Sequence, residues 1–344
     1  MMIDSKLTGA ARLKLLCFLF ILLPFTVSAQ KPELKFHDGW FKIVQFTDLH
    51  YVVGSAKSKQ AEECIREVVM DEKPDLVVVT GDIIYSSPGD TCLQAVINIF
   101  ESLRVPYCML LGNHDPEQGT PVSLLYDRMT RGAYNVQPVR QGTSLDYVLP
   151  VQASRSKATA ALIYCFQSYA KSRMSGVGGY QWFTWRQISW YRERSQSFRS
   201  RHGGRTLPAV AFMHYPLPEY NLAMSDPQVS FFGTRMERAY TPKLNSGLFT
   251  QMKEMGDVMA VFCGHDHDND YSLMYYGILL AHGRYSGGNT EYNHLRNGAR
   301  VIVLKEGKRQ LDTWIHERGG AIVNSTHFPT DYVKDNWKKR TGTR

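Results

Sequence analysis

The sequence predicts an α/β fold, a four-layer sandwich in which two facing mixed β-sheets are flanked by helices. The first half alternates short apolar runs with helix-period segments, which is typical of a parallel sheet with right-handed helical crossovers. After Met255 the pattern becomes rich in strand-like runs, which indicates further strands. Five of the apolar runs end in short polar clusters, and in open α/β sheets ligands bind at the carboxyl ends of strands.

The first half reads as β-α-β-α-β between residues 41 and 111. Strands are expected over residues 41–46, 75–80 and 105–111, where apolar side chains run together. A helix is expected over residues 58–70, with Ala61, Ile65 and Val68 on one face, and another over residues 91–103.

Later elements follow the same rules. Strands are expected over residues 145–149, 161–166, 208–213, 258–263, 271–276, 278–282, 300–304 and 310–315, and a helix over residues 184–198. Residues 215–246 show little periodicity and contain four prolines, so this segment is either a wall or lid of a functional site or a linker. It begins directly after His214, which favours the wall or lid.

Five polar clusters each follow a predicted strand. They are Asp48-Leu49-His50, Gly81-Asp82, Gly112-Asn113-His114-Asp115, His214 and Gly264-His265-Asp266-His267. Residues two apart on an extended segment point to the same side. Asp48 and His50 can therefore bind a shared pair of metal ions from one direction, and so can His265 and His267. We therefore expect the clusters to meet at one edge.

The chemistry of these side chains predicts a centre for two divalent or trivalent metal ions. The expected ligands are Asp48, His50, Asp82, Asn113, His214, His265 and His267. Mixed nitrogen and oxygen ligation suits manganese, iron or zinc, and Asp82 is the natural bridging carboxylate. Two such ions can hold a hydroxide and stabilise the attacking and leaving oxygens of a displacement at phosphorus, so we expect hydrolysis of a phosphate ester.

His114 has no assigned metal in this scheme. We expect it to act as the general acid that protonates the leaving oxygen, with Asp115 fixing its tautomer. A phosphodiesterase or nuclease with the same centre is one alternative, and a non-catalytic metal-containing binding protein is another. The His114-Asp115 pair argues against a pure binder, because binding alone requires no proton donor.

Charge and composition favour a small phosphorylated substrate over nucleic acid. The formal net charge of +8 is modest, and no aromatic array at stacking spacing accompanies the basic residues. The mature chain keeps five cysteines, an odd number that does not indicate a disulfide framework. The sequence leaves the oligomeric state open.

The N-terminus has the pattern of a cleavable signal. Lys6, Arg12 and Lys14 precede an apolar stretch, and a small-residue site predicts cleavage after Ala29. The alternative is a membrane anchor, but the stretch is short for a spanning helix and contains Pro24. We expect a secreted or periplasmic protein without a stable membrane anchor, with a signal peptide over residues 1–29, a catalytic domain over 30–325 and a basic tail over 326–344.

The five clusters together resemble the signature of the calcineurin-like metallophosphoesterases, and the residues around them are similar to the secreted, purple-acid-phosphatase-like branch. The resemblance implies a two-sheet sandwich around a dinuclear centre. It implies that one metal is held by Asp48, His50, Asp82 and His267, and the other by Asp82, Asn113, His214 and His265. It also implies that His114 is the acid.

Two further residues are candidates for the site. Tyr85 lies three residues after Asp82, where true purple acid phosphatases have an iron-binding tyrosine, but His50 competes for that metal position. We favour His50 as the ligand and Tyr85 as a residue that lines the site. Arg284 is a candidate for clamping the phosphate, because its planar fork matches two phosphate oxygens; the alternative is a solvated arginine in a turn.

Overall fold

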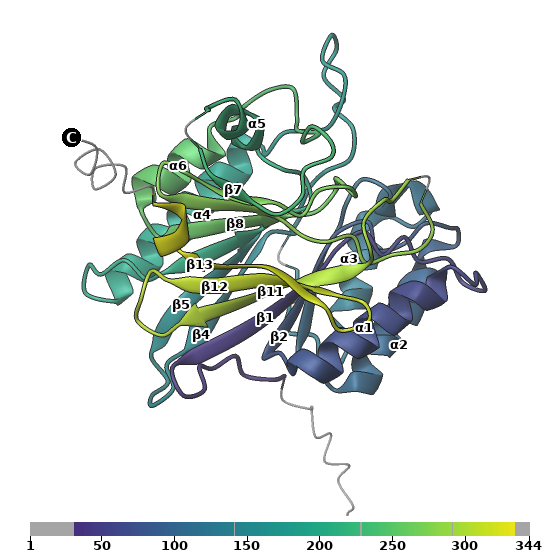
Figure 1. Cartoon of the computed structure of the whole chain (residues 1–344), viewed down its shortest axis with the longest axis horizontal. Helices are drawn as coiled ribbons and strands as arrows, with labels where there is room; N and C mark the ends of the chain where they lie inside the picture. Colours follow the sequence, from purple (N-terminus) through teal and green to yellow (C-terminus); the bar gives the residue numbers. More distant parts are fainter. Residues whose placement is uncertain (1–30, 141, 228, 291, 334–344) are drawn as a thin grey trace, which may run out of the picture. The chain divides into compact units, whose positions relative to one another are not determined.

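Two β-sheets form the centre of the structure (Figure 1). The computed structural model describes residues 31–333 apart from residues 141, 228 and 291. The predicted signal peptide, residues 1–29, and the end of the basic tail lie outside these residues. Among the helices of the described part, none has the length and apolar character needed to cross a membrane.

The first sheet has the strand order β13-β12-β11-β1-β2-β3. Its strands are β1 (Trp40–Phe46), β2 (Leu76–Thr80), β3 (Tyr107–Leu110), β11 (Gly298–Lys305), β12 (Leu311–Glu317) and β13 (Ile322–Phe328). The strands β1, β2 and β3 are parallel and are connected by α1 (Ser58–Glu72) and α2 (Gly89–Leu103). The predicted β-α-β-α-β unit is therefore confirmed.

The second sheet has the order β4-β5-β6-β8-β10-β9-β7. Its strands are β4 (Tyr147–Gln152), β5 (Thr159–Cys165), β6 (Ala209–Phe212), β7 (Phe231–Phe232), β8 (Val258–Cys263), β9 (Ser272–Tyr275) and β10 (Ile278–His282). The neighbours β5, β6, β8 and β10 are parallel to one another. Both sheets also contain antiparallel pairs, so both are mixed, as predicted.

The helices cover the outer faces of the two sheets. The helices α1, α2 and α3 (Val122–Met129) contribute to a large apolar cluster with residues of both sheets. The helices α4 (Trp185–Arg201), α5 (Glu219–Met224) and α6 (Leu248–Met255) contribute to a second cluster with the other face of the second sheet. Figure 1 shows these two groups of helices on opposite sides of the sheets, so the four-layer prediction is confirmed.

The inner faces of the sheets share one core. Phe41 and Ile43, on the same face of β1 as Gln45, belong to the same buried cluster as Ile163, Phe212 and Phe262 of the second sheet. The rings of Phe212 and Phe262 stack with their centroids 5.3 Å apart. The five cysteines of the described residues are buried free thiols, in line with the expectation of no disulfide framework.

The C-terminal boundary predicted at residue 325 is wrong. The strand β13 continues to Phe328 and pairs Thr326 with Thr313 of β12. The hydroxyl of Tyr332 then forms hydrogen bonds with Thr326 (2.7 Å) and Ser272 (2.6 Å). The packed domain thus extends into the predicted basic tail. The sequence did not indicate this, because the edge strand β13 has little apolar pattern.

The loops that leave the two sheets contact each other at one edge. The side-chain amide of Gln45 at the end of β1 donates to the carbonyl of Cys263 at the end of β8 (2.9 Å). The backbone N–H of Thr47 donates to the hydroxyl of Ser286, in the loop after β10 (3.2 Å). The carboxyl ends of β1 and β8 therefore meet, which brings the first and last polar clusters together.

Candidate metal centre

The loops after β1 and β2 remain paired beyond the strands. The backbone N–H of Asp48 donates to Gly81 (3.1 Å), and that of His50 donates to Asp82 (3.0 Å). Asp48, His50 and Asp82 have positive φ angles of 54°, 44° and 47°, a region that costs side-chain-bearing residues energy. The paired backbone holds these strained turns in place and sets the three side chains next to each other.

Two glycines allow the remaining loops to approach closely. A Cβ atom on Gly112, after β3, would lie 2.3 Å from the Oδ1 atom of Asp82. A Cβ atom on Gly264, after β8, would lie 1.8 Å from the hydroxyl of Thr47. Any larger residue at these positions would push the loops apart, so the glycines of the motifs are required for the site to assemble.

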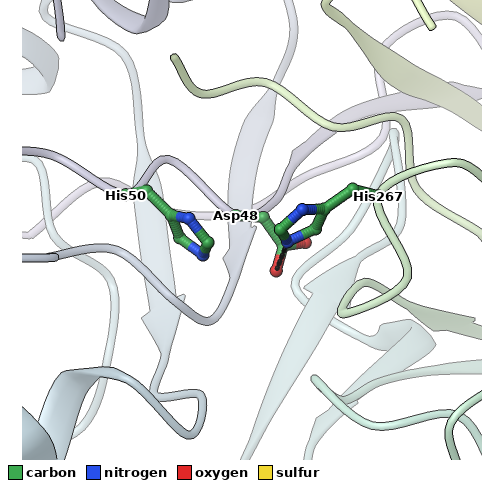
Figure 2. Close-up of side chains that lie close together, drawn as sticks. All are labelled: Asp48, His50 and His267. Atoms are coloured by element: carbon green, nitrogen blue, oxygen red, sulfur yellow. Dashed lines mark ion pairs between the residues drawn. The ribbon is translucent and has the colours of Figure 1, made fainter. Parts of the chain in front are cut away.

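The predicted ligands form two groups. Asp48, His50 and His267 each place one ligand atom within 4.8 Å of the others, and so do Asp82, His214 and His265. Figure 2 shows the rings of His50 and His267 directed toward the carboxylate of Asp48, and the Nε2 atom of His267 lies 3.7 Å from its Oδ1 atom. The Oδ1 atom of Asn113 joins the second group, 3.1 Å from the Nε2 atom of His214.

The Oδ2 atom of Asp82 lies between the two groups. It is 3.6 Å from the Nε2 atom of His50 in the first group and 3.2 Å from the Nε2 atom of His214 in the second. The other oxygen of this carboxylate accepts the backbone N–H of His114 (2.8 Å), which fixes its orientation. This is the geometry expected of a bridging carboxylate.

Backbone carbonyls orient three of the ligand imidazoles. The Nδ1 atom of His50 forms a hydrogen bond with the carbonyl of Asn289 (3.0 Å), and that of His214 with the carbonyl of Thr80 (2.8 Å). The Nδ1 atom of His267 does the same with the carbonyl of Tyr292 (3.2 Å). Because a carbonyl only accepts, each Nδ1 carries the proton, and the Nε2 atom faces the other ligands. Asn289 and Tyr292 lie in the loop after β10, which carries no apolar pattern, so sequence reasoning missed them.

The donor set fits metal ions. The Oδ1 atom of Asp48 and the Nε2 atom of His50 are buried and have no hydrogen-bond partner among the described residues. Burying such atoms unpaired is unfavourable unless a cation satisfies them. Imidazole nitrogens together with carboxylate and amide oxygens match manganese, iron or zinc better than calcium or magnesium.

The charges of the site are strongly coupled. Burial alone would lower the pKa of His214, but the neighbouring carboxylate of Asp82 raises it to about 9. Burial and the nearby His214 lower the pKa of His265 to about 3. His265 is therefore a neutral donor at physiological pH, whereas a proton on His214 competes with a metal ion for the same nitrogen.

The structure contradicts the predicted role of Asp115. Its carboxylate is fully buried and accepts backbone N–H groups from Ile83 (2.8 Å), Ile84 (3.0 Å) and Gly112 (2.7 Å). It therefore fastens the loop after β2 to the loop after β3 and does not contact the ring of His114. The partner of the His114 Nδ1 atom is Glu117, at 2.7 Å. A short helical turn over Asp115–Gln118 brings Glu117 back to His114. The spacing of three residues between His114 and Glu117 is the local signal in the sequence that could have identified this pair.

His114 and Tyr85 both lie beside the first ligand group. The Nε2 atom of His114 is 4.0 Å from the Oδ2 atom of Asp82, and its side chain is 29% exposed. The ring of Tyr85 stacks on His50, with centroids 4.7 Å apart and an interplanar angle of 8°, and meets the edge of His114 at 4.9 Å. Tyr85 thus packs directly against His50, one of the predicted ligands.

Arg284 does not serve as a phosphate clamp in this structure. Its side chain is 3% exposed, and its guanidinium forms ion pairs with Asp270 and with Glu317 (3.1 Å). A further N–H donates to the carbonyl of Arg296 (2.7 Å). The predicted role is wrong because the fork of Arg284 already binds protein carboxylates.

The segment after His214 forms one wall of the site. A cavity of about 390 Å³ next to His265 is lined by Tyr180, Glu237, Tyr240 and Tyr292. The backbone N–H of Tyr240 donates to Asp266 (3.1 Å), and Glu237 accepts the backbone N–H of Asp268 (2.9 Å). Of the two alternatives for residues 215–246, these contacts support a wall, held against the loop that carries His265 and His267. Sequence reasoning missed Tyr180, which comes from an irregular loop.

Comparisons with known proteins identify the family and the fold of this chain. A family model described as calcineurin-like phosphoesterase matches residues 41–269. The probable inactive purple acid phosphatase 14 of Arabidopsis thaliana is 28% identical, with 84% of this chain and 80% of that protein aligned. Phosphatase DCR2 of Saccharomyces cerevisiae is 26% identical over 85% of this chain and 56% of its own length. The crystal structure of a dimetal phosphatase from Danio rerio shares the fold, with 14% identity, a TM-score of 0.57, and coverage of 83% of this chain and 98% of that one.

Proposed function

This chain belongs to the calcineurin-like phosphoesterase family, and from that premise we propose that it is an active, metal-dependent phosphoesterase. Its substrate is a small phosphate ester. The proposal depends on one observation: the Oδ2 atom of Asp82, a member of the second group of donors, lies 3.2 Å from the Nε2 atom of His214 in that group and 3.6 Å from the Nε2 atom of His50 in the first. A single metal ion would not require two such groups.

The residues would divide the work as follows. Two ions held by the predicted ligands would supply Lewis acidity to the phosphate oxygens and lower the pKa of a water molecule. His114 would donate a proton from its Nε2 atom to the leaving oxygen, because that nitrogen faces Asp82. Glu117 would hold the ring in this orientation through the Nδ1 atom. Tyr85 and His50 would keep the ring from tilting, because both rings make nearly perpendicular contacts with it.

The wall of the site favours a small ester over nucleic acid. The tyrosines of the cavity near His265 offer ring surfaces for the organic part of a substrate. Glu237 in the same cavity repels further phosphate groups, so it disfavours a polyanionic strand. A phosphomonoester or a small diester satisfies both features.

The main alternative is a non-catalytic binding protein that keeps a metal centre. The Arabidopsis thaliana relative is named a probable inactive phosphatase, and the Saccharomyces cerevisiae relative is named a phosphatase. The complete donor set and the partly exposed His114 support activity for this chain, because a binder needs no acid next to its metals.

We further propose that the protein acts outside the cytosol. The support is the charged, apolar and small-residue order of residues 1–29 in the sequence. Mass spectrometry of the protein recovered outside the cytosol should give a mature chain that begins at Gln30. A chain that retains Met1 and stays in the cytosol would contradict this proposal.

A phosphoester panel tests the activity. The chain from residue 30, loaded with manganese, iron or zinc, should hydrolyse p-nitrophenyl phosphate, lose activity on chelation and regain it when metal is restored. Asp82→Asn should reduce hydrolysis to background. Asp312→Asn should not, because Asp312 lies on β12 and its carboxylate pairs with Lys305 of β11. If bis-p-nitrophenyl phosphate is the far better substrate, the enzyme is a phosphodiesterase. A chain that binds two ions and hydrolyses no ester of the panel is a binding protein.

A further inference from the structure

A further group of metal-type ligands lies apart from the residues of the proposed centre. Glu67 and Asp71 are four residues apart on α1 and so lie on the same face of the helix. His316 comes from β12. Each of the three places one ligand atom within 4.8 Å of the others. None of them is a ligand of the proposed two-metal centre.

The ring of His316 is oriented as metal-binding histidines are. Its side chain is 5% exposed, and its Nδ1 atom lies 2.8 Å from the Oε1 atom of Glu72. That carboxylate is itself fixed by the indole N–H of Trp314 (3.0 Å) and the ammonium of Lys42 (2.9 Å). An ionised carboxylate only accepts, so the Nδ1 atom carries a proton. Carboxylate–histidine–metal triads have this form.

The opposite nitrogen of His316 is buried and unpartnered. Its Nε2 atom has no hydrogen-bond partner among the described residues, and the Oδ2 atom of Asp71 lies 3.6 Å away. This distance is too long for an effective hydrogen bond. It is close to the separation of about 3.4 Å between two ligands that are each about 2.1 Å from a tetrahedral zinc ion. A lone pair that faces carboxylates is unfavourable unless a cation lies between them.

We propose that Glu67, Asp71 and His316 bind a single divalent transition-metal ion, with Zn²⁺ the best match to one imidazole and two carboxylates. The charge of the ion balances the two carboxylates. Asp71 is 55% exposed, so the ion enters from solvent, and a water molecule completes the coordination. Glu67 is positioned by a hydrogen bond from the backbone N–H of Gly319. The ion ties the C-terminal half of α1 to β12 and so stabilises the first sheet.

Zinc content of matched variants tests this site. The wild-type chain and Asp71→Asn are equilibrated with the same buffered free zinc, and the bound metal is counted by mass spectrometry. The wild type is expected to hold one more equivalent of zinc per chain and to show a zinc-dependent rise in Tm that the variant lacks. Glu63→Gln is the control, because Glu63 is also on α1, is also 55% exposed and pairs with Arg318 outside the group.

The difference between variants is independent of the two-metal centre, because every chain compared carries the same Asp48 and Asp82. If that centre failed to bind zinc, the wild type would still hold one equivalent more than Asp71→Asn. His316→Gln should lose the same equivalent, which guards against an effect of surface charge alone. Equal zinc content in the wild type and in Asp71→Asn would overturn the proposal, as would zinc anomalous peaks confined to the ligands of the proposed centre.

Discussion

The Nε2 atom of His214 lies 3.2 Å from the Oδ2 atom of Asp82, and both side chains are buried. Asp82 follows β2 of the first sheet, and His214 follows β6 of the second. The Nδ1 atom of His214 also forms a hydrogen bond with the carbonyl of Thr80, the last residue of β2 (2.8 Å). The site is therefore built across the seam between the sheets, and its geometry depends on how they pack.

Removing the proposed acid should affect substrates according to their leaving groups. His114→Ala is expected to lower kcat on an alkyl phosphate by about 10²–10⁴-fold, because an alkoxide leaves poorly without a proton. The loss on p-nitrophenyl phosphate should be much smaller. Glu117→Ala should give a loss of about 10–100-fold with the same preference, because it frees the ring that Glu117 orients.

Steady-state kinetics on both esters, together with metal analysis, checks this prediction. Metal content should stay that of the wild type in both variants, because neither residue is an expected ligand. Equal losses on the two esters, or a loss of bound metal with unchanged residual kinetics, would show that His114 is not the acid.

Arg284 should prove to be a residue of the scaffold. Arg284→Gln leaves Asp270 buried without its ion-pair partner, and breaking a buried pair in this way costs about 3–5 kcal/mol. Urea unfolding should show this loss, while KM for a phosphate ester stays within about twofold of the wild-type value. Arg318→Gln is a control on a more exposed pair and should cost at most about 1 kcal/mol. A raised KM with wild-type stability would instead restore the phosphate clamp.

The half-buried carboxyl of Asp146 should make stability depend on pH. Burial raises the pKa of Asp146 to about 6, from an ordinary value of 3.8. Because the folded pKa is the higher one, the stability that this group contributes is present below pH about 4 and is lost as the pH rises toward about 6. Asp146→Asn keeps an oxygen for the N–H groups of Gln167 and Gln187 and removes the titration.

The free energy of unfolding of Asp146→Asn, relative to the wild type, should therefore increase between pH 4 and pH 6. Urea denaturation of both chains at several pH values measures this difference, and groups that titrate in both chains cancel. A difference that does not change with pH would mean that Asp146 ionises normally.

Local rules account for most of the fold that the sequence predicts. The strands β8 and β10 have the predicted limits, because their apolar runs are bounded by polar residues or glycine. The positions of the metal-type residues follow from the same signal, since each cluster directly follows an apolar run at a carboxyl end. The structure then brings these residues into two groups around Asp82.

The sequence could not predict contacts made between distant segments. The strand β13 is mostly polar and is recognised only by its pairing with β12. Arg284 follows β10, whose carboxyl end lies at the edge that carries the site. The positions of Asp270 and Glu317, which form ion pairs with Arg284, depend on how the two sheets pack. Asp115 is adjacent to His114, yet its carboxylate turns to the backbone of Ile83. In each case a tertiary contact decides the role of the side chain.

The central claim is that the chain holds a pair of metal ions on either side of Asp82. Anomalous diffraction from crystals equilibrated with manganese tests it most directly. We expect two peaks among the predicted ligands, about 3.5–4 Å apart, with the carboxylate of Asp82 between them. A single peak there, or none, at a manganese concentration that saturates binding in solution would contradict the account.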